Sequence, residues 1–223
     1  MLSVSPLIEF QQLTCIRDDR VLFSGLDCTI DSGDMVCIKG PNGCGKTTLL
    51  RALTLLLPEF EGNILWRGQS ILQAQYEFLS ELLFVGHLPG IKKTLTPREN
   101  LRFLSNLSGQ YTDEQIDYAL AQVGLYGYED MPGHQLSAGQ GRRIALARLY
   151  LTQAQVWVLD EPYTALDIQG ITRLEQRFKE HAEQGGCIII TSHQEPTITP
   201  LKSIYLPDFR GASITRVQQV SDV

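Results

Sequence analysis

The stretch Gly40-Pro41-Asn42-Gly43-Cys44-Gly45-Lys46-Thr47 decides the fold, because it matches the phosphate-loop pattern G-x-x-x-x-G-K-[ST] at every fixed position. A short apolar run, Asp34 to Lys39, precedes it and predicts a strand. A helical pattern begins at Thr47 and continues behind the loop. The order of strand, glycine loop and helix is the order that a phosphate loop requires.

A glycine loop that turns directly into a helix points backbone N–H groups and the positive end of the helix dipole at one spot, which binds phosphate. Lys46 reaches the β and γ phosphates of a nucleotide, and Thr47 offers a hydroxyl to Mg²⁺. Cys44 could be a thiol whose modification blocks the loop, or simply a small residue at a variable position. The candidate nucleotide-binding residues of the loop are Gly40, Pro41, Asn42, Gly43, Cys44, Gly45, Lys46, Thr47 and Thr48.

Length and composition, with 223 residues, 43% of them hydrophobic, and a net charge of -6, indicate one compact domain or a core with a subdomain. This acidic balance argues against broad nucleic-acid binding, which needs a concentrated basic surface. The five cysteines contain no C-x-x-C pair and indicate thiols in a reducing compartment. We find no long uncharged apolar run and no basic-then-apolar start, so we expect neither a membrane span nor a secretion signal.

The pattern of apolar runs predicts an α/β fold. Residues 7–38 alternate apolar runs with polar turns, which favours a small antiparallel layer, and the helix after Lys46 is expected to reach about Leu57. Two capping boxes, at Thr96 and Thr112, predict helices over 97–108 and 112–123. Further strands are expected at 63–68, 82–85, 155–159, 187–191 and from 203, with a helix at 168–183. Strands separated by helices predict a mainly parallel sheet with helices on both faces.

Two carboxylates, Asp160 and Glu161, follow the apolar run Val156 to Leu159. The carboxyl end of a buried parallel strand is where α/β sheets bind ligands. We therefore expect Asp160 to hold Mg²⁺, through water, and Glu161 to orient or deprotonate an attacking water. Such a general base typically contributes about 10² to 10⁴ in rate.

A third motif, Leu136-Ser137-Ala138-Gly139-Gln140, contains an S-x-x-Q capping box. An amphipathic helix continues from Arg142 to Leu151. The helix N-terminus presents a serine hydroxyl and free N–H groups, so it predicts a second anion site.

Together these motifs resemble the ATP-binding-cassette (ABC) ATPases over nearly the whole chain. Leu136 to Gln140 is similar to the family signature Leu-Ser-Gly-Gly-Gln, with Ala138 in place of one glycine. Ala165-Leu166-Asp167 resembles the family's D-loop, and His193 resembles its switch histidine. The resemblance implies a P-loop NTPase of the ABC type: a mainly parallel sheet, an N-terminal antiparallel β layer and an inserted helical subdomain. It divides a single domain, 1–223, into a nucleotide-binding core (1–86 and 152–223) and a helical subdomain (87–151).

The resemblance also implies ATP and Mg²⁺ as ligands and a head-to-tail homodimer of cassettes. In such a dimer Ser137, Gly139 and Gln140 of one copy contact the ATP held by Lys46 of the other. The implied catalytic residues are Lys46, Glu161 and His193.

Two positions depart from the family pattern. The family usually has a glutamine that touches Mg²⁺ where this chain has His87, and imidazole suits Mg²⁺ poorly. His87 could act through water, or only join the core to the helical subdomain. The family also stacks an aromatic residue on adenine where this chain has Arg17, whose guanidinium plane could stack instead.

Three stretches, 15–23, 86–92 and 136–143, resemble the ATP-binding subunits of bacterial cytochrome c maturation systems, also called haem exporters. That resemblance implies a peripheral protein on the cytoplasmic face of the inner membrane, paired with separate membrane-spanning subunits. We expect no direct haem binding, because the chain has no Cys-Pro or C-x-x-C-H pattern and His134 and His181 are expected to be exposed.

Other functions stay open at this point. The chain could serve another exporter, for a lipid, a drug or a lipoprotein. It could also sense nucleotide without hydrolysing it. A soluble cassette acting on DNA or ribosomes fits less well, because such proteins generally carry a coiled-coil insertion or a second cassette.

Overall fold

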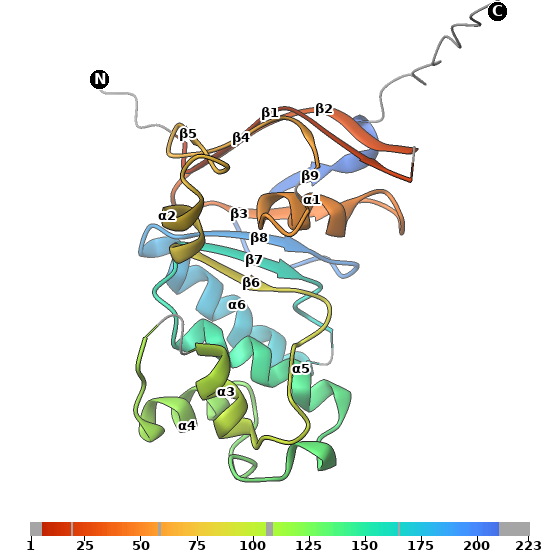
Figure 1. Cartoon of the computed structure of the whole chain (residues 1–223). Coiled ribbons are helices and arrows are strands. Elements are labelled where there is room, and N and C mark those ends of the chain that lie inside the picture. The colour runs from red at the N-terminus through yellow and green to blue at the C-terminus, as the bar shows by residue number, and fades with distance from the viewer. Residues whose placement is uncertain (1–5, 19, 58, 106–108, 165, 210–223) are drawn as a thin grey trace, which may run out of the picture.

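The computed structural model describes residues 6–18, 20–57, 59–105, 109–164 and 166–209, which form two sheets in layers with helices (Figure 1). The antiparallel sheet has the order β2-β1-β4-β5, and its strands are β1 (Ile8–Arg17), β2 (Arg20–Ile30), β4 (Glu61–Trp66) and β5 (Gln69–Ser70). The parallel sheet has the order β6-β7-β8-β3-β9, and its strands are β3 (Met35–Lys39), β6 (Leu82–Val85), β7 (Val156–Asp160), β8 (Cys187–Thr191) and β9 (Lys202–Tyr205).

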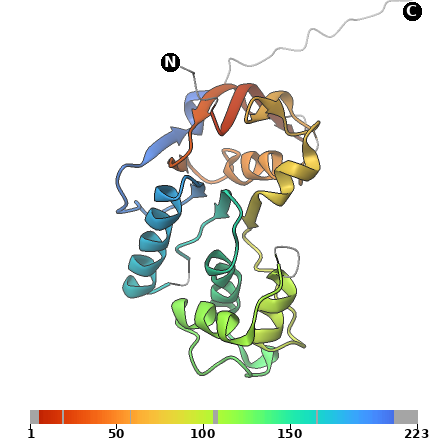
Figure 2. The same ribbon diagram turned by 90° about the vertical axis from the view of Figure 1, so that its left-hand side faces the viewer.

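The helices cover both faces of the parallel sheet. They are α1 (Lys46–Leu53), α2 (Gln75–Ser80), α3 (Pro97–Ser105), α4 (Asp113–Gln122), α5 (Ala138–Ala147) and α6 (Ile168–Glu183), with 3₁₀ turns at Gly133–Gln135, Arg148–Tyr150 and Leu206–Phe209. Helix α1 lies between the two sheets, and α5 and α6 lie on the opposite face of the parallel sheet (Figure 1). Figure 2 shows the green helical part at the end of the molecule farthest from the antiparallel sheet.

Side chains of the parallel strands alternate between two hydrophobic cores. On β7, Val156 and Val158 face the core shared with α1 and the antiparallel sheet, whereas Trp157 and Leu159 face the core shared with α5 and α6. Successive side chains of a strand point to opposite faces, and both faces of β7 are buried. This explains why its apolar run is continuous. The parallel sheet is therefore covered on both faces, and functional groups on its strands can reach a ligand only at the strand ends.

The predicted capping boxes are confirmed. Thr112 accepts from the backbone N–H of Gln115, whose side chain accepts from Thr112 N. Ser137 and Gln140 make the same reciprocal pair at the start of α5. Each pair satisfies two backbone donors that have no partner within the helix, which explains why the helices begin where they do.

Some predicted helix ends were wrong. Helix α1 ends at Leu53 instead of Leu57, because Leu55 adopts a left-handed conformation (φ 56) and the N–H groups of Leu56 and Leu57 turn back to Arg51 O. The regular part of α5 ends at Ala147 and tightens into the 3₁₀ turn that follows. The predicted end of α3, at residues 106–108, lies outside the described residues.

No helix in the described ranges combines the length and the apolar character that crossing a membrane requires.

The expectation of an exposed His181 was wrong. Its imidazole is buried and stacks on Trp157, with ring centroids 3.6 Å apart and planes 7° from parallel. Its Nε2 lies 3.1 Å from Gln155 O. Burial lowers the pKa of His181 to about 4, because desolvation disfavours the charged ring. His134, by contrast, is exposed as expected.

We predict that His181 makes the fold sensitive to acid. Because its folded-state pKa lies below the ordinary value, the unfolded chain takes up a proton first, and stability is lost as pH falls from about 6.5 towards 4. The loss from this group should be roughly 2–3 kcal/mol in the free energy of unfolding. The variant His181→Phe keeps a ring on Trp157 and should show a flatter dependence in urea titrations across pH 4–7. His134→Gln is the control and should leave the slope unchanged.

Candidate nucleotide-binding site

The phosphate loop runs from the end of β3 into the start of α1, as the sequence predicted. Gly43 has φ 76 and an added Cβ would meet nothing within 4 Å, so the backbone borders open space there. Gly45 has φ 108, and an added Cβ would lie 3.1 Å from Leu22 and Phe23 of β2. Gly45 is also the N-cap of α1 and provides no side-chain cap. The first N–H groups of the helix thus face the cleft, where an anion can accept their hydrogen bonds.

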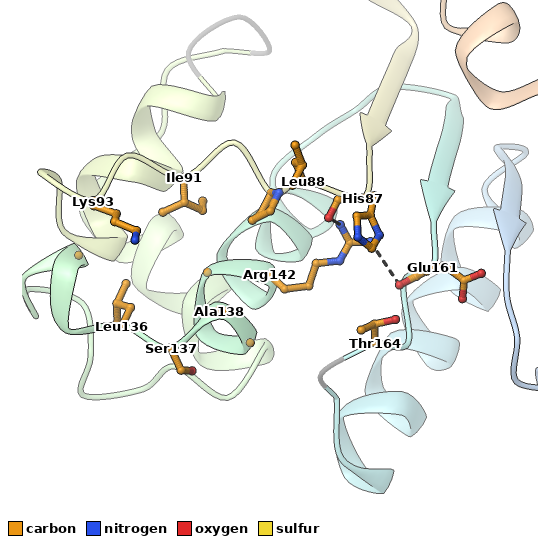
Figure 3. Close-up of a pocket in the computed structure, with 14 residues that line it drawn as sticks. His87, Leu88, Ile91, Lys93, Leu136, Ser137, Ala138, Arg142, Glu161 and Thr164 are labelled. Carbon is orange, nitrogen blue, oxygen red and sulfur yellow. Dashed lines mark hydrogen bonds between the residues drawn. The ribbon is translucent and has the colours of Figure 1, made fainter. Parts of the chain in front are cut away.

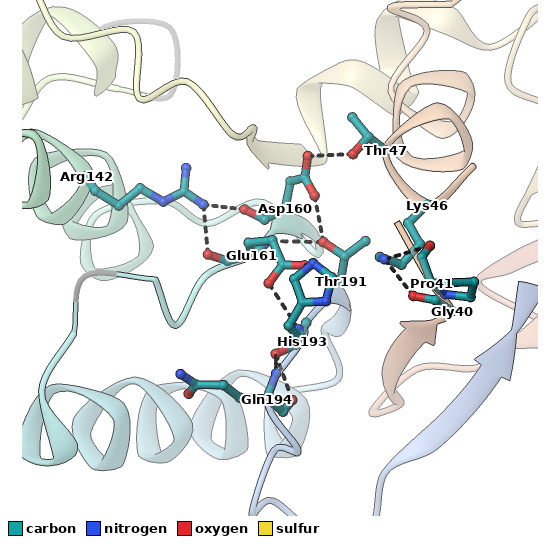
Figure 4. A network of polar contacts seen from close by, with 11 residues as sticks. Gly40, Pro41, Lys46, Thr47, Arg142, Asp160, Glu161, Thr191, His193 and Gln194 are labelled. Carbon is teal, nitrogen blue, oxygen red and sulfur yellow. Dashed lines mark hydrogen bonds and ion pairs between the residues drawn. The ribbon is translucent and has the colours of Figure 1, made fainter. Parts of the chain in front are cut away.

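Lys46 is a buried cation at the first position of α1. Its Nζ donates to Gly40 O at 2.7 Å and to Pro41 O at 3.4 Å (Figure 4). The ammonium group is thereby held on the inner side of the loop, where it can meet phosphate oxygens.

Asp160 joins three elements at the carboxyl edge of the parallel sheet. It is buried at the end of β7 and accepts from Thr47 Oγ1 of α1 at 3.1 Å and from Thr191 Oγ1 of β8 at 2.6 Å (Figure 4). Asp160 and Thr191 are direct partners in the strand register. The carboxylate and the hydroxyl of Thr47 form the oxygen-rich part of the site.

Glu161 follows immediately and faces His193. Its backbone N–H donates to Thr191 Oγ1 at 3.0 Å, and its Oε2 accepts from the backbone N–H of His193 at 3.1 Å. The imidazole Nε2 lies 3.5 Å from Glu161 Oε1. That Oε1 is buried and accepts no hydrogen bond from the described residues. An unpaired buried carboxylate oxygen marks a place where a substrate group can bind.

These groups surround a cleft of about 440 Å³. The predicted residues that line it are Arg17, Asn42, Gly43, Gly45, Lys46, Thr47, Thr48, His87, Asp160, Glu161 and His193. The remaining loop positions predicted for nucleotide binding, Gly40, Pro41 and Cys44, do not line it. Cys44 is buried, with its sulfur packed towards Gly40.

The two departures from the family pattern lie at the edges of the cleft. Arg17 is exposed at the end of β1, with Nε 3.4 Å from Asp18 Oδ2, and forms one wall. His87 is exposed in the loop after β6 and borders this cleft as well as a second one.

The predicted anion site at the start of α5 belongs to the second cavity. This cavity, of about 480 Å³, includes Ser137 and Gly139 (Figure 3). Neither residue lines the first cleft, nor does Gln140. Within one chain the signature stretch and the phosphate loop thus line different cavities, which share His87, Glu161 and Thr164.

Sequence reasoning missed Thr164, which lines the cleft, and two polar residues that position the site. Thr191 holds both Asp160 and the N–H of Glu161, and its position at the end of a strand next to β7 could have indicated this. Arg142 donates to the backbone carbonyls of Asp160 and His87, a contact for which the sequence gives no local signal.

Comparison with known proteins now assigns the family. The model of the ABC transporter family matches residues 23–164. The chain belongs to this family. The cytochrome c biogenesis ATP-binding export protein CcmA of Escherichia coli K12 is 50% identical over 208 residues, which are 92% of this chain and 99% of that protein. CcmA of Aliivibrio fischeri is 50% identical over 189 residues, which are 85% and 93% of the two chains.

Solved structures agree with the fold. An ABC transporter ATP-binding protein from Pyrococcus furiosus superposes with a TM-score of 0.78 at 25% identity, covering 92% of this chain and 99% of that one. CbiO1 from Clostridium perfringens, part of the transporter complex CbiONQ, gives a TM-score of 0.67 at 25% identity and covers 85% and 79%. The predicted ABC ATPase fold is thus confirmed, and the chain is an ATP-binding, ATP-hydrolysing member of this family.

We predict that Lys46→Ala removes measurable ATP affinity, because the loop loses the one side chain whose charge faces the phosphates. The matched control is Lys39→Ala, since Lys39 ends β3 beside the loop but pairs with Glu195 at 2.7 Å. Titration with a fluorescent ATP analogue measures both variants. Undiminished affinity in Lys46→Ala would overturn the assignment of the phosphate loop.

Proposed function

We propose that this chain is the ATP-hydrolysing subunit of an ABC exporter for cytochrome c biogenesis. The observation that carries the proposal is the identity of about half of all residues, over nearly the full length, to proteins of that name. The chain is then a peripheral protein of the translocase class on the cytoplasmic face of the bacterial inner membrane. Its partners are the membrane-spanning subunits of the complex, and it contacts neither nucleic acid nor haem.

The domain division follows from this role. Residues 1–86 and 152–223 form the nucleotide-binding core of a single domain, and residues 87–151 form the helical subdomain. The contacts of α3 with α4 and α5 support treating the helices as one unit.

ATP binds with its phosphates on the loop at 40–47 and at Thr48. The N–H groups of the loop and of α1 contact the phosphate oxygens, and Lys46 neutralises the β and γ phosphates. Arg17 lies at the wall of the cleft where the guanidinium plane can stack on the base. Within the described residues no Phe, Tyr or Trp lines this cleft, and we assign the stacking on the base to Arg17.

The donor set fits Mg²⁺ at Thr47 and Asp160. Both offer oxygen, which this ion prefers, and their oxygens lie 3.1 Å apart. Held by these two residues, Mg²⁺ would supply positive charge against the phosphates. The His87 side chain offers only nitrogen, so its contact with the ion would pass through water, and its other predicted role, joining the core to the helical subdomain, is kept beside it.

Hydrolysis uses Glu161 and His193. Glu161 accepts a proton from water as the water oxygen bonds to the γ phosphorus, and the bond from that phosphorus to the β–γ bridging oxygen breaks to give ADP and phosphate. The carboxylate of Glu161 is the acceptor, and the His193 imidazole, 3.5 Å from its Oε1, contacts the γ phosphate and helps to hold the water. The contact of these two groups favours hydrolysis over a role in nucleotide sensing alone.

Two copies of the chain are required to complete each site. The N-terminus of α5, with Ser137, Gly139 and Gln140, is separate from the cleft of its own chain. In a head-to-tail homodimer it caps the γ phosphate bound to the other copy.

We predict that Glu161→Gln keeps ATP binding and lowers turnover by about 10² to 10⁴, since the amide cannot take the proton. The ATP-bound dimer should live longer. Phosphate release and size-exclusion chromatography with ATP measure the two effects. Glu183→Gln, an exposed position at the end of α6, is the matched control. Turnover at the wild-type rate in Glu161→Gln would show that another group is the base.

The partner assignment has its own test. Tagged protein purified from detergent-solubilised membranes of its own cells should bring down the membrane-spanning subunits of a cytochrome c maturation complex. Recovery of a lipid, drug or lipoprotein permease would leave the ATPase intact and replace the cargo. Recovery of a soluble partner would overturn the membrane assignment.

A further inference from the structure

Arg142, on the second turn of α5, places a buried guanidinium between two loops of the nucleotide site. Only 5% of the residue is exposed. Its Nη1 donates to Gly86 O and, at 3.3 Å, to His87 O, both in the loop after β6. Its Nη2 donates to Asp160 O and, at 3.2 Å, to Glu161 O, at the end of β7 (Figures 3 and 4). One side chain of the helical part thus holds the backbone of both loops.

The burial of this charge is costly and is balanced by the carbonyl dipoles. Desolvation lowers the pKa of Arg142, and the neighbouring Asp160 and Glu161 charges oppose that shift. A planar guanidinium directs two nitrogens at two loops at once, whereas an ammonium is a single point with a flexible stem. The geometry is therefore specific to arginine.

The backbone of Glu161 needs support from both sides. Its φ is 54, a left-handed conformation that a non-glycine residue adopts rarely and at a cost of about 1–3 kcal/mol. Thr191 holds the N–H of Glu161 from β8, and Arg142 holds its C=O from α5. Strained backbone persists at functional sites when its surroundings fix it from more than one direction.

Helix α5 carries a second feature of the site. Ser137 caps the helix, and Arg142 lies little more than one turn further along. Because one helix carries both residues, any shift of α5 would move the guanidinium together with Ser137.

We propose that Arg142 is a positioning residue for ATP hydrolysis, which fixes the backbone of Glu161 against α5 and so transmits the position of α5 to the general base. The proposal rests on the role of Glu161 given under Proposed function. Arg142 touches no reacting atom and acts only through the carbonyls that it holds.

Two variants test this role, Arg142→Lys and Arg142→Gln, with Arg148→Gln as the matched control. Arg148 is also a buried arginine whose pKa is lowered by desolvation, and its Nη1 donates to Phe84 O at 3.1 Å. It shows no hydrogen bond to either catalytic loop in the described part of the chain. Both Arg142 variants should lower kcat by about 10- to 100-fold, the size expected of a misplaced catalytic group. KM and the affinity for a fluorescent ATP analogue should stay within about twofold, and Arg148→Gln should keep its kcat.

A double-mutant cycle with Glu161→Gln separates positioning from general stability. If Arg142 acts through Glu161, then Arg142→Lys should cause little further loss in single turnover once the base is gone. Losses that multiply overturn the proposal, as does wild-type kcat in Arg142→Lys. Thermal unfolding is measured on every variant, and loss of the folded state in both Arg142 variants assigns the residue to stability and also overturns it. Wild-type turnover in the single variant Glu161→Gln would show instead that Glu161 is not the general base. That result is distinguishable from failure of the Arg142 proposal, because Arg142 is unchanged in this variant.

Discussion

The site depends on the hydrogen bonds that the buried carboxylate of Asp160 accepts. It accepts hydroxyl hydrogen bonds from α1 and from β8, while its own backbone belongs to β7. Removing a buried carboxylate from water is favourable only when its oxygens have such partners. The same two bonds therefore stabilise the fold locally and bring the phosphate loop, the acidic strand end and the loop of His193 to one place.

The parallel arrangement of the strands places the other groups of the site at the same edge of the sheet as this carboxylate. Because β6, β7, β8 and β3 are neighbours and run in one direction, the segments that follow them all emerge on the same side. Glu161 follows Asp160 by one residue and so inherits its position, but its side chain turns towards His193 because its φ is positive. The backbone conformation thus gives two adjacent acids different surroundings, since Asp160 is held by hydroxyl groups and Glu161 lies against His193.

Sequence reasoning succeeded where the signal is local. The phosphate loop, the capping boxes at Thr112 and Ser137, and the strand predicted at 155–159 each depend on residues within a few positions. The structure has the loop and both boxes, and it has the strand as Val156–Asp160. It failed where partners come from far along the chain. The stacking of His181 on Trp157 and the contacts of Arg142 with Glu161 join residues about 20 positions apart through tertiary packing. Leu55 ends α1 in a left-handed conformation, and because it is neither glycine nor asparagine the sequence gives no signal for that conformation.

The packing around Arg142 bears on the presence of His87 at a position where the ABC family usually has glutamine. A glutamine at this position can connect the helical part to the site through its own side-chain oxygen, whereas an imidazole offers no oxygen to Mg²⁺. In this chain the backbone of His87 is instead held by Arg142, and the same guanidinium reaches Glu161. A connection made through carbonyls depends on the path of the chain and not on the side chain at 87. If Arg142 has the proposed role, replacing the side chain at position 87 should change the rate of hydrolysis only slightly in this chain. A glutamine that itself contacted the ion would be less replaceable.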